Sequence, residues 1–170
     1  MQPMPSTERL HELFVYDPIS GEIRSRLSRG GRTRAGKLAG DVSAARGYIR
    51  IKIDGRYFYA HRIAWCMMTG RWPAAYIDHI DCDKSNTRWC NLREASKSQN
   101  GANRPKHLRN GTCLSPLKGV SFNSKNGKWF SQILCEGAHQ FLGYFDAEND
   151  AHLAYLAAAQ RLFGKFARAQ

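Results

Sequence analysis

Residues 77–104 read IDHIDCDKSNTRWCNLREASKSQNGANR, a segment that combines apolar, acidic and amide side chains. The apolar run at its start predicts a short buried strand over residues 75–80 that carries Asp78 and His79 near its end. Consecutive side chains of a strand point to opposite faces. One of these two polar groups can therefore lie on each side of a phosphate bound at the end of the strand.

Three further elements are expected after this strand. Residues 85–88 are typical of a loop, residues 89–93 of a second extended segment, and residues 94–103 of a helix. On that helix, the spacing of Asn100 and Asn103 places both side chains on one face.

This set of side chains suits the hydrolysis of a phosphodiester bond. His79 is a candidate general base, because imidazole is the side chain whose ordinary pKa lies nearest to neutrality. Asp78 offers a carboxylate oxygen, and Asn100 can add a second oxygen, which are ligands that a hard divalent cation prefers. The plainer alternative is that the Asp-His pair makes only a turn or a surface hydrogen bond.

The order Asp78-His79, then Asn91-Leu92-Arg93, then Asn100 resembles the HNH nuclease motif in the variant that ends on asparagine. The resemblance implies a two-stranded hairpin and a helix around one divalent metal, a ββα-metal unit. It implies Asp78 and Asn100 as metal ligands, His79 as general base, and Asn91 as the residue that braces the loop. Mg²⁺ is the expected ion and Mn²⁺ the alternative. Asn103 is the alternative second ligand, unless it faces solvent.

Two other features bear on this resemblance. Cys82 stands where glycine is common in phage-type members, and Asn86-Thr87 stands where Asp-Asn is common, so these departures affect the loop and not the implied ligands. The GY…AHRIAW…G…P order of residues 47–73 also resembles the region that precedes the motif in phage-type, homing-like HNH endonucleases. His61 is expected there as a structural or phosphate-contacting residue.

Composition points to a polyanionic partner. The net charge is +12 and the pI is about 9.8, which favours nucleic acid over a membrane. The chain has no apolar run that could span a bilayer and no signal-peptide pattern, so we expect a cytoplasmic protein of a bacterial or phage-infected cell, not a secreted one. Five cysteines without a Cys-x-x-Cys pair favour neither disulfides nor zinc. Zinc held by Cys82, Cys90 and His79 is an alternative with the wrong spacing.

The N-terminal third predicts short elements and a basic arm. Residues 8–16 are amphipathic, residues 22–27 alternate as a strand does, and residues 48–60 predict a hairpin across Asp54-Gly55. A helix over residues 61–69, with Trp65 and Met68 toward the core, should end at Gly70. Between residues 24 and 37 the cations have no acidic neighbour, so we expect DNA contacts from Arg29, Arg32 and Arg34, or else a solvated loop.

The second half of the chain changes character after a Gly- and Pro-containing basic linker at residues 105–116. Strands are expected at residues 118–123, 128–135 and 139–144. A helix that Asp146 caps and Gly164 ends should follow. Its core stripe is expected at five positions, which are Ala147, Ala151, Ala154, Ala158 and Leu162.

Residues 117–168, with KGVSF, GKW, FLGYFDAE and FGKFA in this order, resemble the ethylene-response-factor (AP-two) DNA-binding domain. The resemblance implies that a three-stranded sheet reads the major groove of duplex DNA. The implied reading residues are Lys118, Ser121, Asn123, Gln132 and His139, and Phe141 replaces an expected tryptophan. Lys125 and Lys128 are expected to touch phosphate, whereas alternation places Trp129 on the helix side.

Together these patterns predict an α+β protein with a ββα-metal nuclease unit preceded by small hairpins, and a three-stranded antiparallel sheet packed on one helix. The expected domains are a nuclease at residues 1–104, the linker, and a DNA-binding domain at residues 117–170. The predicted activity is site-directed, metal-dependent cleavage of double-stranded DNA by a chain for which a monomer is favoured. A non-catalytic DNA-binding regulator is the alternative. An RNA-directed protein is disfavoured, because the sheet is expected to lack the exposed aromatic pair that stacks single-stranded bases.

Overall fold

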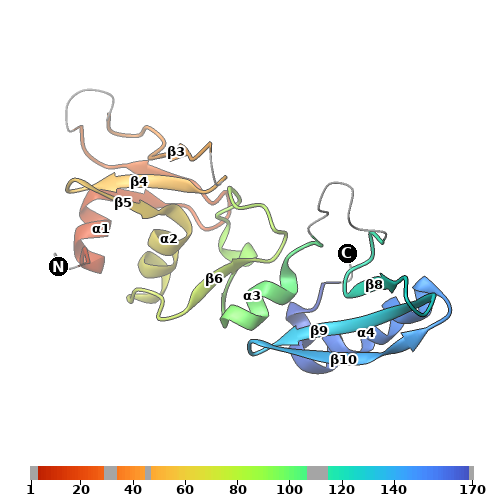
Figure 1. Ribbon diagram of the computed structural model, residues 1–170. Coiled ribbons are helices and arrows are strands. Elements are labelled where there is room, and N and C mark those ends of the chain that lie inside the picture. The colour runs from red at the N-terminus through yellow and green to blue at the C-terminus, as the bar shows by residue number, and fades with distance from the viewer. Residues whose placement is uncertain (1–3, 29–33, 45–46, 107–114, 169–170) are drawn as a thin grey trace. The chain divides into compact units, whose positions relative to one another are not determined.

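The computed structural model describes residues 4–28, 34–44, 47–106 and 115–168 of the chain. Helices mix with small antiparallel sheets, and the chain divides into two compact units, Met1–Glu94 and Ala95–Gln170 (Figure 1). The boundary between the two units lies at residues 94–95, ten residues before the predicted domain boundary at residue 104. The reason is that Ala102 packs in the core of the second unit. The domain assignment itself stays a prediction.

The first unit is a series of short elements. In chain order they are α1 (Thr7–Leu13), β1 (Phe14–Tyr16), β2 (Ile23–Ser25), β3 (Asp41–Val42), β4 (Ile49–Ile53), β5 (Arg56–Tyr59), α2 (Ala60–Thr69), β6 (Tyr76–His79), the 3-10 turn η1 (Trp89–Asn91) and β7 (Leu92–Ala95), whose last residue begins the second unit. Strands β1 and β2 pair as a hairpin, β3, β4 and β5 form a second sheet in that order, and β6 pairs with β7.

Local signals explain most of these boundaries. Ser6 caps α1 by accepting a hydrogen bond from the Arg9 backbone N–H at 3.2 Å. Asp54 and Gly55, with φ of 45° and 85°, form the two-residue turn between β4 and β5, as predicted. Gly70 ends α2 in the left-handed conformation, which confirms the predicted helix end.

One apolar cluster holds the first unit together. It joins α1, β4, α2 and the strand pair β6–β7 through buried side chains that include Leu10, Ile53, Ile63, Ile77 and Leu92. The prediction that Met68 faces the core is wrong, because this side chain is 43% exposed, and Trp65 is only partly buried. Trp65 nevertheless packs against the cluster, so the prediction for this residue is confirmed in part.

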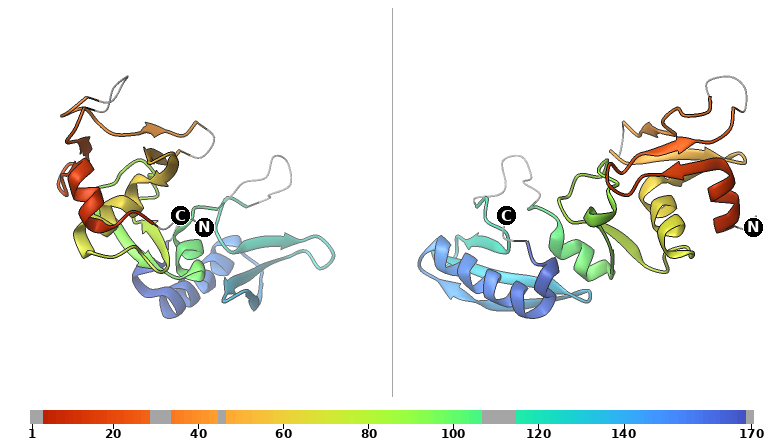
Figure 2. Two further views of the ribbon diagram at one scale, coloured as in Figure 1. Left: turned by 90° about the vertical axis from the view of Figure 1, so that its left-hand side faces the viewer. Right: turned by 180° about the vertical axis from the view of Figure 1, so that it is seen from behind.

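The second unit contains a three-stranded sheet and two helices. Its elements are α3 (Lys97–Asn103), β8 (Val120–Asn123), β9 (Lys128–Cys135), β10 (Ala138–Phe145), α4 (Glu148–Phe163) and the 3-10 turn η2 (Gly164–Phe166). The strands are antiparallel in the order β10-β9-β8, as the sequence predicts. Helix α4 covers one face of this sheet, which Figure 2 shows from behind. The other face carries no element of this unit among the described residues.

Helix boundaries and faces differ in part from the sequence prediction. Asp146 does not cap α4, since Ala147 takes the cap position without a side-chain bond and Asp146 pairs with Lys128 at 2.9 Å. Gly164 ends the helix, as predicted. The buried face of α4 is turned from the expected alanine stripe, because Tyr155 and Phe163 have more apolar surface to bury. That face consists of Ala151, Tyr155, Ala158, Ala159 and Phe163.

In the described parts of the chain, no helix has the length and apolar character that crossing a bilayer requires.

Candidate active site

Strand β6 carries two buried polar side chains at its C-terminal end. Ile77 anchors the strand in the apolar cluster, and the next two residues, Asp78 and His79, are 4% and 5% exposed. The backbone N–H of Ile80 donates to the carbonyl of Asn91 at 2.9 Å, which closes the loop between β6 and β7. The predicted strand over residues 75–80 is therefore present, but the segment that was expected to be extended from Trp89 begins with the 3-10 turn η1.

Arg93 on β7 fixes the carboxylate of Asp78. Its Nε donates to Oδ2 of Asp78 at 2.8 Å, and its Nη2 lies 2.8 Å from the same oxygen. Both side chains are largely buried, so this charge-assisted pair compensates the buried negative charge. The sequence analysis used Arg93 only to recognise the motif and missed this contact. The signal that could have suggested it is an arginine at the start of the second strand of the motif, within reach of the acidic end of the first.

His79 packs in a cluster of aromatic rings. The rings of His61 and His79 meet edge to face, with centroids 4.8 Å apart and an interplanar angle of 81°. The ring centroid of Tyr48 lies 5.9 Å from that of His79. Burial lowers the pKa of His79, although Asp81, Asp78 and Asp83 act in the opposite direction. Burial, followed by the charge of His79, lowers the pKa of His61 to about 3. His61 is 6% exposed, as a structural residue would be.

Asn91 lies inside the loop that follows β6. Its Nδ2 donates to Oδ1 of Asp81 and to the carbonyl of Asn86, both at 2.9 Å, and its Oδ1 accepts from the backbone N–H of Asp81 at 3.0 Å. Asn86 donates to the other oxygen of Asp81 at 2.6 Å. Burial acts to raise the pKa of Asp81, but the bonds from Asn86 and Asn91 hold it below its ordinary value. Asn91 thus bonds both ends of the loop, and its role in catalysis stays a prediction.

The sequence analysis assigned no role to Asp81. The acidic and amide residues of the loop form side-chain turns, in which Asp81 and Asp83 each accept from a backbone N–H two residues later at 2.8 and 2.9 Å. This spacing of Asp, Ser and Asn is the signal that could have identified a rigid loop in place of a merely polar one.

The β1–β2 hairpin supports the same loop from the N-terminal side. Tyr16 donates its hydroxyl to the carbonyl of Thr87 at 2.7 Å, and Thr87 donates to the carbonyl of Gly21 at 2.5 Å. The two backbones approach so closely that a Cβ on Gly21 would lie 2.5 Å from the backbone nitrogen of Arg88. The loop conformation is thus set by residues some seventy positions away in sequence.

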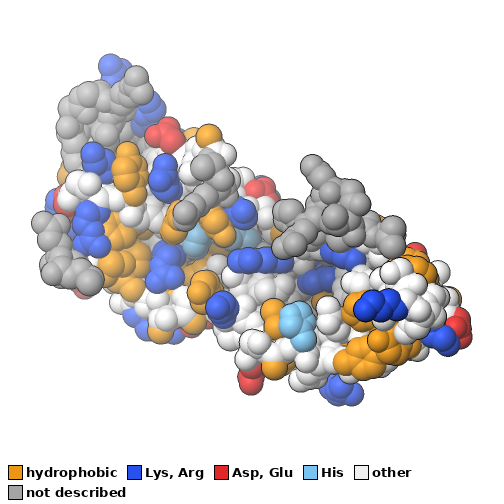
Figure 3. All heavy atoms as spheres, in the orientation of Figure 1, with side chains coloured by type: hydrophobic (Ala, Val, Ile, Leu, Met, Phe, Trp, Pro, Cys, Tyr) orange, Lys and Arg blue, Asp and Glu red, His pale blue; other side chains and the backbone are white. Residues whose placement is uncertain are grey.

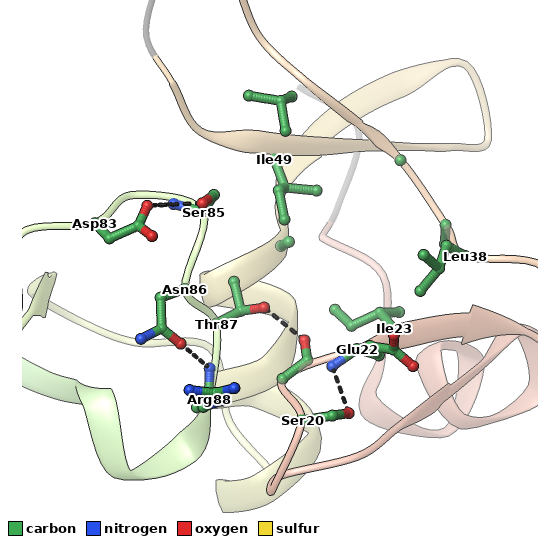
Figure 4. Close-up of a pocket in the computed structure, with 15 residues that line it drawn as sticks. Ser20, Glu22, Ile23, Leu38, Ile49, Asp83, Ser85, Asn86, Thr87 and Arg88 are labelled. Carbon is green, nitrogen blue, oxygen red and sulfur yellow. Dashed lines mark hydrogen bonds between the residues drawn. The ribbon is translucent and has the colours of Figure 1, made fainter.

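A cavity of about 460 Å³ lies between this loop and the hairpin (Figure 4). Its apolar wall includes Ile23, Leu38 and Ile49, and Thr87 and Arg88 belong to its polar wall. Asp78, His79 and Asn91 do not line it. Figure 4 shows Thr87 directed toward Gly21 across one edge, so the cavity is a gap in the support of the loop and not the place of the predicted chemistry.

The predicted metal ligands lie in different units. Asp78 is in the first unit, whereas Asn100 and Asn103 are on α3 in the second. Asn103 is 5% exposed, so it does not face solvent, and Asn100 is half-buried. The choice of Asn100 or Asn103 as the second metal ligand beside Asp78 stays a prediction. Helix α3 begins at Lys97 and not at residue 94, because Glu94 and Ala95 belong to β7.

Among the described residues, no three His, Cys, Asp or Glu side chains come together as a metal-binding group. Cys82, Cys90 and His79, the alternative zinc ligands, do not come together as such a group in this part of the chain. The expected Mg²⁺ ligands are one carboxylate and one amide, a set that water and substrate phosphate complete. The buried carboxylate of Asp78, oriented by Arg93, fits such a group.

The predicted DNA contacts of the basic arm can be placed only in part. Arg34 is exposed, and Arg29 and Arg32 lie outside the described residues.

Most predicted contacts of the second unit lie on its sheet. His139 and Lys125 are exposed, and Ser121, Asn123 and Gln132 are half-buried. Lys128 is exposed but pairs with Asp146. Lys118 differs from the rest, because its ammonium donates to the backbone carbonyls of Ala102 and Arg104 and so binds the chain itself. Trp129 is half-buried beside Phe122, with ring centroids 5.0 Å apart.

Comparison with known proteins finds similarity to HNH endonucleases in the region that contains the candidate active site. The family model described as HNH endonuclease matches residues 58–102, which include α2, β6 and β7. The chain is 31% identical over 109 residues to an uncharacterised HNH endonuclease of Acanthamoeba polyphaga mimivirus, a match that covers 63% of this chain and 54% of the relative. The chain thus spans about half the length of the curated relative that it matches.

One solved structure is also similar, with a lower sequence identity. It shows DNA binding and cleavage by the HNH homing endonuclease I-HmuI, and the match has 25% identity over 53% of this chain and 50% of that chain. The TM-score of 0.40 is below the level at which two folds are the same. The family match ends at residue 102 and does not extend to the three-stranded sheet. Residues 58–102, which carry Asp78, His79, Asn91 and Asn100, are therefore similar in sequence to the HNH endonuclease family.

Proposed function

We propose that this chain is a metal-dependent DNA endonuclease that hydrolyses phosphodiester bonds at the end of β6. One observation carries the proposal: the buried pair Asp78 and His79 stands beside Arg93 and Asn91 within the segment that matches HNH endonucleases. Desolvated, fixed polar groups are costly for a fold, and they are what catalysis at a charged centre requires.

His79 acts as the general base. Burial favours its neutral imidazole, which can accept a proton from the attacking water. The carboxylates of Asp81, Asp78 and Asp83 stabilise the imidazolium that this transfer creates. The ring of His61 packs against the ring of His79 and holds it in place.

Asp78 holds the metal together with an amide of α3, for which we propose Asn100 with Asn103 as the alternative. A bound divalent ion, Mg²⁺ or else Mn²⁺, supplies positive charge that neutralises the departing oxygen. Arg93 orients the carboxylate for this role by binding Oδ2. Asn91 keeps the loop after β6 in one conformation through Asp81 and Asn86.

The substrate that we propose is double-stranded DNA. The net charge of +12 supports a polyanionic partner, and Arg29, Arg32 and Arg34 are its proposed phosphate contacts in the first unit. The resemblance of residues 117–168 to the AP-two family adds a second proposed DNA contact. Cytoplasmic location and a monomeric state also stay proposals.

Plasmid cleavage tests the proposal. We expect the purified chain to cut plasmid DNA with Mg²⁺ or Mn²⁺ and to leave it intact in EDTA. His79→Ala should slow cleavage by about a hundredfold or more, because it removes the general base, and should bind DNA in EDTA as the parent does. His11→Ala, which changes an exposed histidine of α1, is the matched control.

Two results would contradict this assignment. The first is cleavage at the parental rate by a folded His79→Ala protein. The second is a parental protein that shifts DNA in a gel but cuts it with neither ion, which is the behaviour of a non-catalytic regulator. If the nuclease is confirmed, Asn100→Ala and Asn103→Ala compared over a range of Mg²⁺ concentrations identify the second ligand, because its loss should raise the Mg²⁺ requirement.

A further inference from the structure

The two faces of the β8–β10 sheet have different side chains. On β9, Ser131 and Ile133 are 0% and 2% exposed and pack toward α4. Alternation therefore turns Phe130, Gln132 and Leu134 to the opposite face. We call this second face the open face, because α4 covers only the other one.

A β-bulge adds two aromatic rings to the open face. Phe141 pairs with Gln132, but the next pair joins Gly143 to Ser131, so Leu142 is an extra residue in β10. Strict alternation would put Phe141 and Tyr144, three positions apart, on opposite faces. The bulge instead brings both to the open face, where Tyr144 pairs with Phe130. Gly143 permits it with φ of 137°, a value that favours glycine.

The result is an aromatic strip, which we define as Phe130, Phe141 and Tyr144. Phe141 is 59% and Tyr144 50% exposed. The ring centroids of Phe141 and Tyr144 are 5.1 Å apart, and those of Phe130 and Tyr144 are 6.2 Å apart. The expectation that this sheet lacks an exposed aromatic pair is therefore wrong, because the bulge places Phe141 and Tyr144 on the same face.

Polar and cationic groups border the aromatic strip. The Nδ2 of Asn123 donates to the hydroxyl of Tyr144 at 3.4 Å, and Gln132 pairs with Phe141 on the neighbouring strand. Lys125 and Lys128 are exposed at the β8–β9 turn. Figure 3, which looks onto this face, shows hydrophobic side chains over the strands with Lys and Arg side chains near them. Lys and Arg also outnumber Asp and Glu over residues 95–170.

We propose that the aromatic strip binds single-stranded DNA by stacking its unpaired bases. Exposed rings on a sheet offer π-faces to bases of any sequence, and cations at the rim attract the phosphates. The commonest base-specific contact to a DNA duplex is a bidentate hydrogen bond from arginine or lysine to guanine. Residues 120–145, which contain the whole sheet, have no arginine for such a contact. The positive charge of the unit favours a polyanion over an apolar protein partner. This inference goes beyond the proposed cleavage of double-stranded DNA.

The test measures binding by the full chain in EDTA, with a fluorescein-labelled oligothymidylate and fluorescence anisotropy. Phe141→Leu and Tyr144→Leu keep apolar surface but remove a ring, so each should weaken binding by about tenfold. Phe141→Trp keeps an aromatic face and should bind as the parent does. Leu153→Ala, at a 61% exposed position of α4, is the control away from the sheet and should change nothing.

The outcomes separate stacking from other modes of binding. The proposal is overturned if both leucine variants bind oligothymidylate as tightly as the parent, or if Phe141→Trp binds as weakly as Phe141→Leu. It is also overturned if the variants lose only duplex binding. An equal loss with oligouridylate supports it, since uracil offers a π-face for stacking as thymine does. The binding test contains no metal ion, so a negative result does not bear on the proposed nuclease activity. Likewise, binding of oligothymidylate can still be measured if the protein does not cleave DNA.

Discussion

The candidate active site and the open face use their distinctive side chains in opposite ways. At the active site, Asp78, His79 and Asn91 are nearly buried, and Arg93 and Asp81 hold two of them by hydrogen bonds. On the open face, by contrast, large apolar rings are exposed and contact mainly one another.

This difference separates the proposed chemistry from the proposed recognition. A reacting centre gains from groups that are fixed and shielded from water, and the surrounding fold must stabilise them. A surface that stacks bases must stay accessible, so it adds little to stability and can be changed at little cost to the fold. Single substitutions should therefore disturb the first region much more than the second.

The largest effect is expected where the hairpin meets the loop. Gly21→Ala should lower the free energy of unfolding by about 3 kcal/mol, because it adds a Cβ 2.5 Å from the backbone of Arg88 at a φ of 79°. Gly36→Ala is the control: it has nearly the same φ, 78°, but open space around its Cβ, and should cost about 1 kcal/mol. Urea unfolding measures both. Equal losses would show that backbone conformation, and not the close approach, matters at Gly21.

A somewhat smaller effect is expected at the loop brace. Asn91→Ala leaves Asp81 with fewer donors and should lower stability by about 2 kcal/mol and cleavage by about 10- to 100-fold. Asn126→Ala, at an exposed turn of the second unit, is the matched control. Thermal melting and plasmid cleavage provide the two readouts. Full activity in a folded Asn91→Ala protein would mean that the loop does not need its brace.

Acid should weaken the first unit through His61. Its pKa of about 3 in the folded chain lies below the ordinary 6.5, so the unfolded chain binds this proton first as the pH falls. The stability present above pH 6.5 is thus lost between pH 6.5 and 3, by about 2 kcal/mol on going from pH 7 to pH 5.

Denaturant unfolding at both pH values checks this effect. His61→Phe removes the titrating group, and the loss between pH 7 and pH 5 should then shrink by about 2 kcal/mol. His11→Phe is the control at an exposed position and should behave as the parent does. If His61→Phe loses as much stability in acid as the parent, His61 is not the group responsible.

The smallest effect is expected on the open face. Phe141→Leu should change the free energy of unfolding by less than about 0.5 kcal/mol, because the ring is mostly exposed. A loss as large as that of Asn91→Ala, measured by the same melting experiment, would remove the contrast between the two regions. The aromatic strip would then be part of the fold and not a surface held ready for a ligand.

Several elements could be predicted because their signals are local. The turn at Asp54-Gly55 and the helix end at Gly70 follow from the backbone preferences of one or two residues. Strands β8, β9 and β10 follow from short alternating runs between turn residues. The order of Asp78, His79, Asn91 and Asn100 identified the candidate site, since the motif lies in a continuous stretch of sequence.

Three of the predictions that failed involve a partner on a neighbouring strand. Helix α3 starts late because pairing with β6 takes Glu94 and Ala95 into β7. Asp146 pairs with Lys128 on a neighbouring strand and so does not cap α4. The open face gained its aromatic pair from a bulge that alternation does not reveal. In each case a partner outside the local segment determined the result.

The sequence by itself therefore determined which residue types are available for phosphodiester chemistry and most of the elements that carry them, because both are properties of neighbouring residues. Only the tertiary structure decided what those residues touch. The pairs Asp78–Arg93, His79–His61 and Thr87–Gly21 join positions that are far apart in the chain. Such contacts depend on how the elements pack, because burial is what makes each of these polar groups need its partner.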